Sequence, residues 1–289
     1  MPYIHTETFR VRHYECDRYG EVHAANYLRY MQEAAFGASE AVGFPPERYE
    51  SLGLQWLAYE TDIAYNAPLH YGDTLTIRTW VQDFRRVRSL RIYELKRDDQ
   101  TIARASTDWV LLDTVTRRPT SVTREIIDAY TQGEAVDTAP PRRPLPPARI
   151  PEHGLFTIHR HARWHEIDMA QHVNNAVFLE YALDCEMQAM TYYEWPVEML
   201  RSHGLALALR RHQIEYKQAA VLDDELAIST WIAVLDETTV FRHFVIRRVA
   251  DDVLLARIRG LRELVDAETG VARPLPEQYL DDFALNTRS

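Results

Sequence analysis

The sequence contains an internal repeat, with the two copies 151 residues apart. Asp17 in the first copy corresponds to Asp168 in the second. The same offset holds without a gap through a series of identical residues, at Arg12/Arg163, Glu15/Glu166, Val22/Val173, Leu28/Leu179, Tyr30/Tyr181, Ile63/Ile214, Tyr65/Tyr216, Trp80/Trp231 and Arg91/Arg242. Solenoid repeats have much shorter periods, of about 20–50 residues. The offset therefore predicts a duplicated domain, so that the chain folds as two copies of one architecture.

A proline-rich segment separates the copies. Residues 133–154, GEAVDTAPPRRPLPPARIPEHG, contain six prolines. Proline favours an extended chain and lacks the backbone donor that a central strand needs. We therefore expect a linker at 133–152 between an N-terminal domain, 1–132, and a C-terminal domain, 153–289, and we expect the two domains to superpose.

Each copy has the same predicted order of secondary structure. A first strand, at about 3–15 and 155–166, leads through a polar loop into a long helix. Four strands rich in β-branched residues follow, and a short helix closes each copy, at 123–131 and 276–283. The long helices are predicted at 25–43 and 175–193 because apolar residues recur there at helical steps, as at Leu28, Met31, Ala35 and Ala38. Strands in succession with one early helix predict an α+β fold, an antiparallel sheet packed on a helix.

Composition excludes several classes of protein. The net charge of −10 disfavours nucleic acid as a partner. No apolar run reaches the ~18 residues that a membrane-spanning helix needs, and the first residues carry no apolar signal region. Two cysteines, Cys16 and Cys185, cannot form a disulfide framework. We expect a cytoplasmic protein without a membrane partner.

The loop before the second long helix gathers polar residues. Asp168, His172, Asn174 and Asn175 fall within HEIDMAQHVNN, residues 165–175. The first backbone N–H groups of a helix lack partners and carry about half a positive charge, which suits a developing oxyanion. Asp168 could act as a base or a nucleophile toward a carbonyl held there, and His172 could donate to a leaving group. Similar residues recur in the first copy, at Asp17, His23 and Asn26.

Helix capping is the simpler interpretation of these residues. Asp and Asn are common caps. A cap needs one such residue, whereas this loop has four polar groups and a related set in the other copy, which favours a functional site.

The loop sequences resemble those of a known family. DMAQHVNNAVFLEY, residues 168–181, is similar to the D-x-N-x-H-V-N-N motif of the hotdog-fold acyl-carrier-protein thioesterases. YECDRYGEVHAANYLRYMQEAA, residues 14–35, resembles the same segment of the 4-hydroxybenzoyl-CoA thioesterase group, in which an Asp precedes G-x-V-x-x-x-N-Y. The resemblance covers nearly the whole chain. It implies two tandem hotdog domains, each with a long central helix wrapped by an antiparallel sheet.

The resemblance also implies roles for the loop residues. Asp168 and Asp17 match the catalytic acid of the family, and His172 matches the histidine of the carrier-protein enzymes. Backbone N–H groups around Asn175 and Ala24 would polarise the thioester carbonyl, with Asn174 and His23 beside them. This chain departs from the pattern at three positions, Ala170 for an asparagine, Glu21 for the histidine in copy one, and Ala219 for a downstream glutamate. The departures favour a mechanism closer to that of the CoA-type enzymes.

Other chemistry has weaker support. Cys16 adjoins Asp17 but has no histidine at a recognisable spacing, and a lone cysteine is usually just buried. Histidines 159, 161, 165 and 172 lack the Cys/His spacing of structural zinc. No G-x-S-x-G motif indicates an α/β-hydrolase. Arg91 and Arg242 lie in matching arginine-rich strands, which could clamp a CoA or phosphopantetheine phosphate or, slightly favoured, form a solvated sheet face.

We therefore expect an acyl thioester hydrolase acting on acyl-CoA or acyl-carrier protein, with no metal or cofactor and with possible self-association. The alternatives are a hotdog dehydratase or hydratase and a non-catalytic acyl-thioester-binding regulator. The second copy is the expected working copy, since the first has Glu21, Ala24 and Ala25 where we place His172 and the asparagine pair. A second carboxylate near Asp17 would repel an oxyanion.

Overall fold

The structure is a computed structural model that describes residues 2–131 and 154–284. The chain divides into two compact units, Met1–Arg143 and Pro144–Ser289. The predicted linker at 133–152 lies outside the described residues, so the exact domain boundaries stay a prediction.

The N-terminal unit is an antiparallel sheet with one long helix. Its strands pair in the order β1-β3-β4-β5-β2. Along the chain its elements are β1 (His5–Arg10), a 3₁₀ turn (His13–Glu15), α1 (Ala24–Ala41), α2 (Pro46–Ser51), β2 (Leu54–Tyr65), β3 (Thr74–Arg85), β4 (Arg88–Arg97), β5 (Gln100–Asp113) and α3 (Arg124–Thr131).

The C-terminal unit repeats this order of elements. Its strands pair as β6-β8-β9-β10-β7. The elements are β6 (Phe156–His161), a 3₁₀ turn (Trp164–Glu166), α4 (Asn175–Tyr192), α5 (Val197–Ser202), β7 (Leu205–Tyr216), β8 (Glu225–Leu235), β9 (Thr239–Arg248), β10 (Leu254–Asp266) and α6 (Glu277–Asp282). Even a bulge is repeated at the same offset, between Val81 and Asp83 in β3 and between Ile232 and Val234 in β8.

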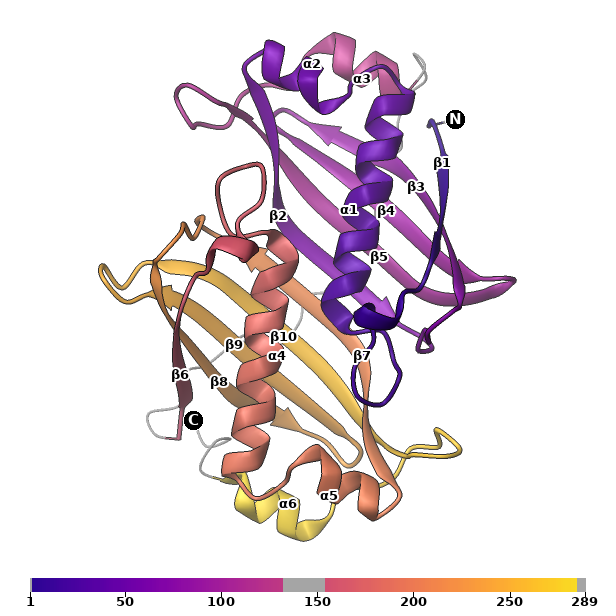
Figure 1. The fold of residues 1–289 in the computed structure, drawn as a ribbon, viewed down its shortest axis with the longest axis vertical. Coiled ribbons are helices and arrows are strands. Elements are labelled where there is room, and N and C mark those ends of the chain that lie inside the picture. The colour runs from indigo at the N-terminus through magenta and orange to yellow at the C-terminus, as the bar shows by residue number, and fades with distance from the viewer. Residues whose placement is uncertain (1, 132–153, 285–289) are drawn as a thin grey trace. The chain divides into compact units, whose positions relative to one another are not determined.

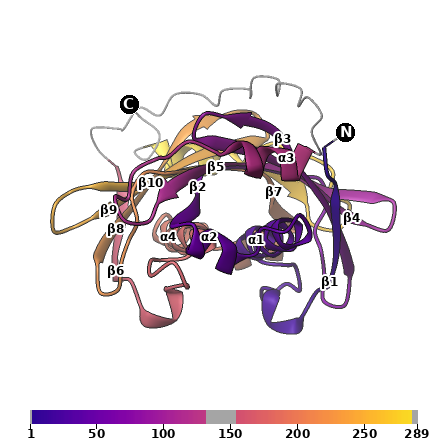
Figure 2. The same cartoon turned by 90° about the horizontal axis from the view of Figure 1, so that it is seen from above.

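In each unit the long helix lies against the concave face of its own sheet (Figures 1 and 2). The predicted helical stripe, Leu28, Met31, Ala35 and Ala38, is buried. The helix ends where the sequence indicates, because Gly43 follows it with a φ of +81°, a conformation that glycine adopts without strain. This is the helix-on-sheet arrangement that the hotdog resemblance implies.

Two local features differ from the prediction. The first strands are shorter than expected and end at Arg10 and His161, each followed by a 3₁₀ turn. The short helices α2 and α5 were not predicted. Each begins after a proline, whose fixed φ suits the first residues of a helix even in a six-residue segment too short to show a hydrophobic period.

Both interpretations of Arg91 and Arg242 were wrong, because neither side chain is on a solvated face or open to a ligand. Their exposed fractions are 5% and 2%. Each guanidinium lies 3.4 Å from the hydroxyl of the neighbouring strand's threonine, Thr79 or Thr230, and faces an aromatic ring, that of Tyr130 or of Phe283. Both arginines are therefore part of the interior of their unit.

The interior of the C-terminal unit also contains a buried ion pair. Glu186 of α4 is 3% exposed, and its two carboxylate oxygens accept hydrogen bonds of 2.7 Å each from Arg262 of β10. Arg242 lies 3.9 Å from the same carboxylate. The first copy has Ala35 at the position of Glu186. The two units thus share a fold but differ in the polarity of their interiors.

A buried histidine makes stability depend on pH. His243 is 2% exposed and stacks on Trp231 with ring centroids 5.4 Å apart. Burial, with a contribution from the charge of Arg259, lowers its pKa from 6.5 to about 4. Because the unfolded chain binds a proton near pH 6.5 and the folded protein only near pH 4, stabilisation from neutral His243 is complete above pH 6.5 and is lost as the pH falls toward 4.

We expect His243→Phe to remove this pH dependence. A shift of this size corresponds to about 3 kcal/mol of unfolding free energy, at about 1.4 kcal/mol for each pH unit. Urea unfolding of both proteins at pH 7 and pH 4 measures the difference. The matched control is His161→Phe, since His161 is exposed. Equal losses of stability in wild type and His243→Phe would contradict the prediction.

Candidate active site

The polar loop of the second copy is a tight, hydrogen-bonded turn. Ile167 and Val173 form an antiparallel bridge. Inside it, the Asp168 N–H donates to the carbonyl oxygen of His172 at 3.0 Å, and the Gln171 N–H donates to that of Asp168 at 2.9 Å. Gln171 has a φ of +64°, in the position that Gly20 occupies in the first copy. The turn therefore fixes the backbone of Asp168 and His172 just before α4.

The carboxylate of Asp168 is held at both oxygens. Its Oδ1 accepts the Ala170 N–H at 2.8 Å, and its Oδ2 accepts the Nδ2–H of Asn174 at 3.0 Å. The side chain is partly exposed, so an oriented carboxyl group lies at the start of α4.

Asn174 is the helix cap and also the tether of Asp168. Its Oδ1 accepts the Ala176 N–H at 3.0 Å, and its carbonyl accepts the Val177 N–H at 3.0 Å. The capping interpretation is thus correct for Asn174. It does not account for Asp168, whose described bonds go to the turn and to the Asn174 amide rather than to first-turn N–H groups of α4.

The first N–H of α4 remains available. The Asn175 N–H has no hydrogen bond within the part of the chain that the structure describes, while the Asn175 carbonyl accepts the hydroxyl of Tyr216 at 3.1 Å. An N–H at a helix start attracts negative charge through the macrodipole. This donor and the Asp168 carboxylate lie at the same end of α4.

A buried carboxylate, that of Glu166, stabilises the loop through hydrogen bonds. The sequence did not lead us to predict this role. Glu166 is 7% exposed; its Oε2 accepts the Tyr181 hydroxyl at 2.6 Å and the Arg163 N–H at 2.7 Å, and its Oε1 pairs with Arg160. The Glu166 carbonyl accepts the Asn174 N–H at 2.9 Å. Burial, with Glu166 adding to it, raises the pKa of Tyr181, which keeps the phenol protonated and donating. The signal was present in the repeat, at Glu15 and Tyr30.

The first copy has the same turn with a different surrounding. Asp17 is exposed, and its Oδ1 accepts the N–H groups of Tyr19 at 2.8 Å and Glu21 at 3.1 Å. Below it, Glu15 accepts the Tyr30 hydroxyl at 2.5 Å, as Glu166 does in the second copy. The scaffold is therefore duplicated, whereas the setting of the aspartate is not.

The alignment of the two helix starts needs a correction. In the register of 151, Asn174 pairs with His23 and Asn175 pairs with Ala24, so Ala25 has no part in the comparison. His23 is the N-cap residue of α1 but provides no side-chain cap, whereas Asn174 caps α4. Asn26 is buried and donates to the Glu15 carbonyl at 2.8 Å, which makes it a structural residue of this copy.

The downstream segment that should carry a glutamate does lie beside the loop. The Val173 N–H donates to the carbonyl oxygen of Ala220 at 2.9 Å, which brings the Ala219–Ala220 segment next to the start of α4. Neither alanine can supply a carboxylate. The departure that the sequence shows at Ala219 therefore lies beside the candidate site.

The remaining candidates gain no support. Burial, then Asp17 and Glu15, raise the pKa of the Cys16 thiol, and burial raises that of Cys185 to about 12, so neither favours the reactive thiolate. Within residues 2–131 and 154–284, no three His, Cys, Asp or Glu side chains are grouped to hold a metal. In the same ranges, no helix has both the length and the apolar character to cross a bilayer.

Comparisons with known proteins match both halves of the chain. Residues 2–130 match the model of the acyl-ACP thioesterase N-terminal domain, and residues 162–283 match that of the thioesterase-like superfamily. The chain belongs to the hotdog-fold acyl thioesterases. This confirms the family and the α+β tandem hotdog fold that the sequence predicted.

Individual relatives agree with the family. A chloroplastic acyl-[acyl-carrier-protein] hydrolase of Cuphea viscosissima is 25% identical over 78% of this chain and 55% of its own length. The chain thus spans about half the length of that relative. Two solved structures share the fold. The 12:0-ACP thioesterase of Umbellularia californica has a TM-score of 0.73 and 17% identity, and the match covers 90% of this chain and 94% of the other. An acyl-ACP thioesterase of Bacteroides thetaiotaomicron has a TM-score of 0.69 and 19% identity, and the match covers 90% of this chain and 98% of the other.

Proposed function

We propose that this hotdog thioesterase hydrolyses acyl thioesters of a phosphopantetheine carrier and releases a carboxylic acid of the fatty acid class. The observation that carries the proposal is the bridge made by Asn174, which binds the Asp168 carboxylate with its Nδ2 and caps α4 with its Oδ1. One side chain thereby fixes a carboxyl group beside the positive end of a helix, and this is the pair of groups that thioester hydrolysis needs.

The proposed reaction uses the groups at the start of α4. The thioester carbonyl oxygen accepts a hydrogen bond from the Asn175 N–H, which stabilises the oxyanion of the tetrahedral intermediate. Asp168 takes a proton from the attacking water, or attacks the carbonyl carbon to give an acyl-aspartyl intermediate that water then cleaves. The C–S bond breaks, the thiolate leaves, and His172 lies in the turn from which it can supply the proton.

Two substrate classes fit this reaction, acyl-carrier protein and acyl-CoA. The acyl-carrier-protein relatives support the first class. Ala170 and Ala219 replace two polar residues of that group's pattern, which supports a CoA-type mechanism in the same site. We infer that the shared phosphopantetheine thioester is the recognised unit. A cytoplasmic location and self-association remain predictions from the sequence.

Thiol release from matched substrates tests the proposal. Acyl-carrier protein and acyl-CoA are compared over a panel of chain lengths, with a thiol-specific dye and detection of the free acid. We expect stoichiometric thiol and acid from at least one series, with no loss of rate after treatment with a chelator. Binding without thiol release would favour the regulator, and addition or loss of water on the acyl chain would favour the hydratase; either result contradicts hydrolysis.

A further inference from the structure

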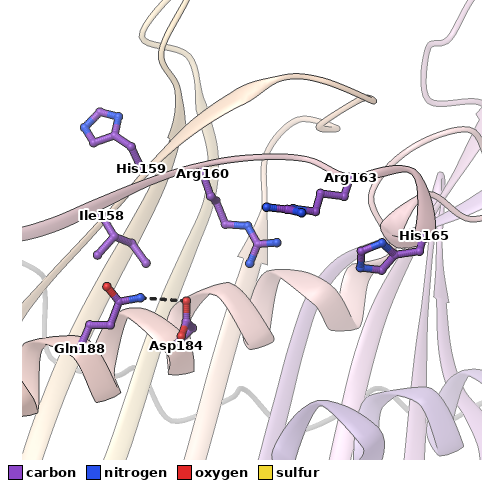
Figure 3. Close-up of a pocket in the computed structure, with 7 residues that line it drawn as sticks. All are labelled: Ile158, His159, Arg160, Arg163, His165, Asp184 and Gln188. Atoms are coloured by element: carbon purple, nitrogen blue, oxygen red, sulfur yellow. Dashed lines mark hydrogen bonds between the residues drawn. The ribbon is translucent and has the colours of Figure 1, made fainter.

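A basic groove lies between β6 and α4 in the C-terminal unit (Figure 3). Its volume is about 450 Å³. Figure 3 shows the guanidinium groups of Arg160 and Arg163 reaching into the space between the β6 segment and α4, while His159 points away from the helix. His165 lines the groove from the turn, and Asp184 and Gln188 line it from α4.

Among the described residues, one arginine of the groove forms no ion pair, in contrast to its neighbour. Arg160 is neutralised by Glu166 and lies over the ring of Tyr181, 4.0 Å from its centroid. Asp184 accepts the Gln188 amide at 3.0 Å. Arg163 is exposed, and its guanidinium has no ion pair with any residue of the described ranges. A free, planar fork of donors in a polar groove matches the oxygens of a phosphate.

The duplication provides an internal comparison. At an offset of 151, the first-copy counterparts of Ile158, Arg160, Arg163, His165 and Asp184 are Glu7, Phe9, Arg12, Tyr14 and Glu33. Phe9 packs on Tyr30 with ring centroids 5.2 Å apart, in the place where Arg160 lies over Tyr181 in the second copy. The guanidinium of Arg12 lies 3.5 Å from the Glu15 carboxylate. The hotdog scaffold therefore does not require basic residues at the positions of Arg160 and His165. The arginine at the position of Arg163 occurs in both copies, but in the first copy it is paired with Glu15.

The groove residue Arg163 is near the proposed catalytic loop in the sequence, which limits the distance between them. Arg163 precedes Asp168 by five residues, so their Cα atoms are at most about 18 Å apart even in a fully extended chain. The Arg163 N–H also donates to Glu166, whose carbonyl accepts the Asn174 N–H. One network therefore fixes both the groove and the start of α4. A phosphopantetheine arm has a phosphate at one end and the thioester at the other, which suits this arrangement.

We propose that Arg163, with Arg160 and His165 beside it, binds the phosphate of the substrate's phosphopantetheine arm while the thioester lies at Asp168. The inference rests on the proposed function. CoA and carrier protein share this phosphate, whereas the nucleotide and its further phosphates belong to CoA alone. The groove therefore recognises what the two substrate classes have in common.

Four substrates with the same acyl chain separate these contributions. Acyl-pantetheine lacks the phosphate, acyl-4′-phosphopantetheine has it, and acyl-CoA and acyl-carrier protein extend it in two different ways. We expect Arg163→Gln to raise KM about tenfold for the three phosphorylated substrates. This effect is at the low end of the range for the loss of hydrogen bonds to a charged group. The KM for acyl-pantetheine and all kcat values should stay within about twofold. The matched control is Arg12→Gln, the same change in the first copy, which should alter none of the four.

Two results would overturn the inference. One is equal KM values of wild type for acyl-pantetheine and acyl-4′-phosphopantetheine; the other is an effect of Arg163→Gln on acyl-CoA alone, which would assign Arg163 to the nucleotide. Calorimetric binding of an S-alkyl phosphopantetheine thioether, which cannot be hydrolysed, separates this inference from the reaction itself. If hydrolysis fails, a tenfold weaker Kd in Arg163→Gln still supports the groove, and an unchanged Kd contradicts it.

Discussion

Replacing Asp168 with asparagine should lower kcat by about 10²–10⁴, the usual contribution of a general acid or base. Asparagine has nearly the same shape and can still accept the Ala170 N–H, so the turn should persist. It cannot take a proton from water or form an anhydride with the acyl group. The loss should therefore appear in kcat, with KM nearly unchanged, in steady-state kinetics on the best substrate of the panel.

The same change in the first copy is the matched control. Asp17→Asn should cost less than about tenfold, because Asp17 is exposed and the residue in the position of Asn174 is His23, which does not cap α1. The double variant should resemble Asp168→Asn. If Asp17→Asn proves the more damaging substitution, the working site is in the first copy and our assignment is wrong.

Single turnover in H₂¹⁸O tests for the acyl-aspartyl route, which is shown by label in Asp168. An acyl-aspartyl intermediate is opened by water, and attack on the aspartyl carbon would leave ¹⁸O in the enzyme, whereas a general base directs all label into the released acid. Mass spectrometry of the peptide that contains Asp168 therefore complements the kinetics of the variant.

The local pattern of the sequence was sufficient to predict the helices that carry the site. The offset between Asp17 and Asp168 identified two equivalent turns, and the apolar steps from Leu28 to Ala38 located the central helix. These features depend on neighbours along the chain, which a sequence displays directly. The tether between Asn174 and Asp168 was not predicted, because it depends on how a turn of a few residues folds back on the helix start.

The misassigned arginines show what a sequence does not display. Arg242 looks like one of several exposed arginines in FRHFVIRRV, but its surroundings come from α4 and from Phe283 near the end of the chain. Burial of a strand residue depends on which face the helix covers, and that is decided by contacts far apart in sequence. Glu186 likewise looks like an ordinary helix-surface acid until Arg262 is placed opposite it.

Removing that acid should strongly destabilise the C-terminal unit. In Glu186→Ala, the partly buried Arg262 loses a bidentate carboxylate, and the buried Arg242 loses its nearby negative charge. Breaking a buried pair by removing one partner typically costs 3–5 kcal/mol, because an uncompensated charge stays inside. Urea unfolding at pH 7 should show a loss of about this size. Glu33→Ala, at an exposed position of α1, should stay within about 0.5 kcal/mol.

The pH dependence identifies the charge as the cause. Burial alone would raise the pKa of Glu186, but the charge and hydrogen bonds of Arg262, with Arg242 and His212, lower it below its ordinary value of 4.5. Stability from the ionised carboxylate is therefore present above pH 4.5 and is lost as the pH falls through the lower folded pKa. The difference between wild type and the isosteric Glu186→Gln should shrink in that acidic range. A constant difference would mean that packing, rather than the ion pair, keeps Glu186 in the interior.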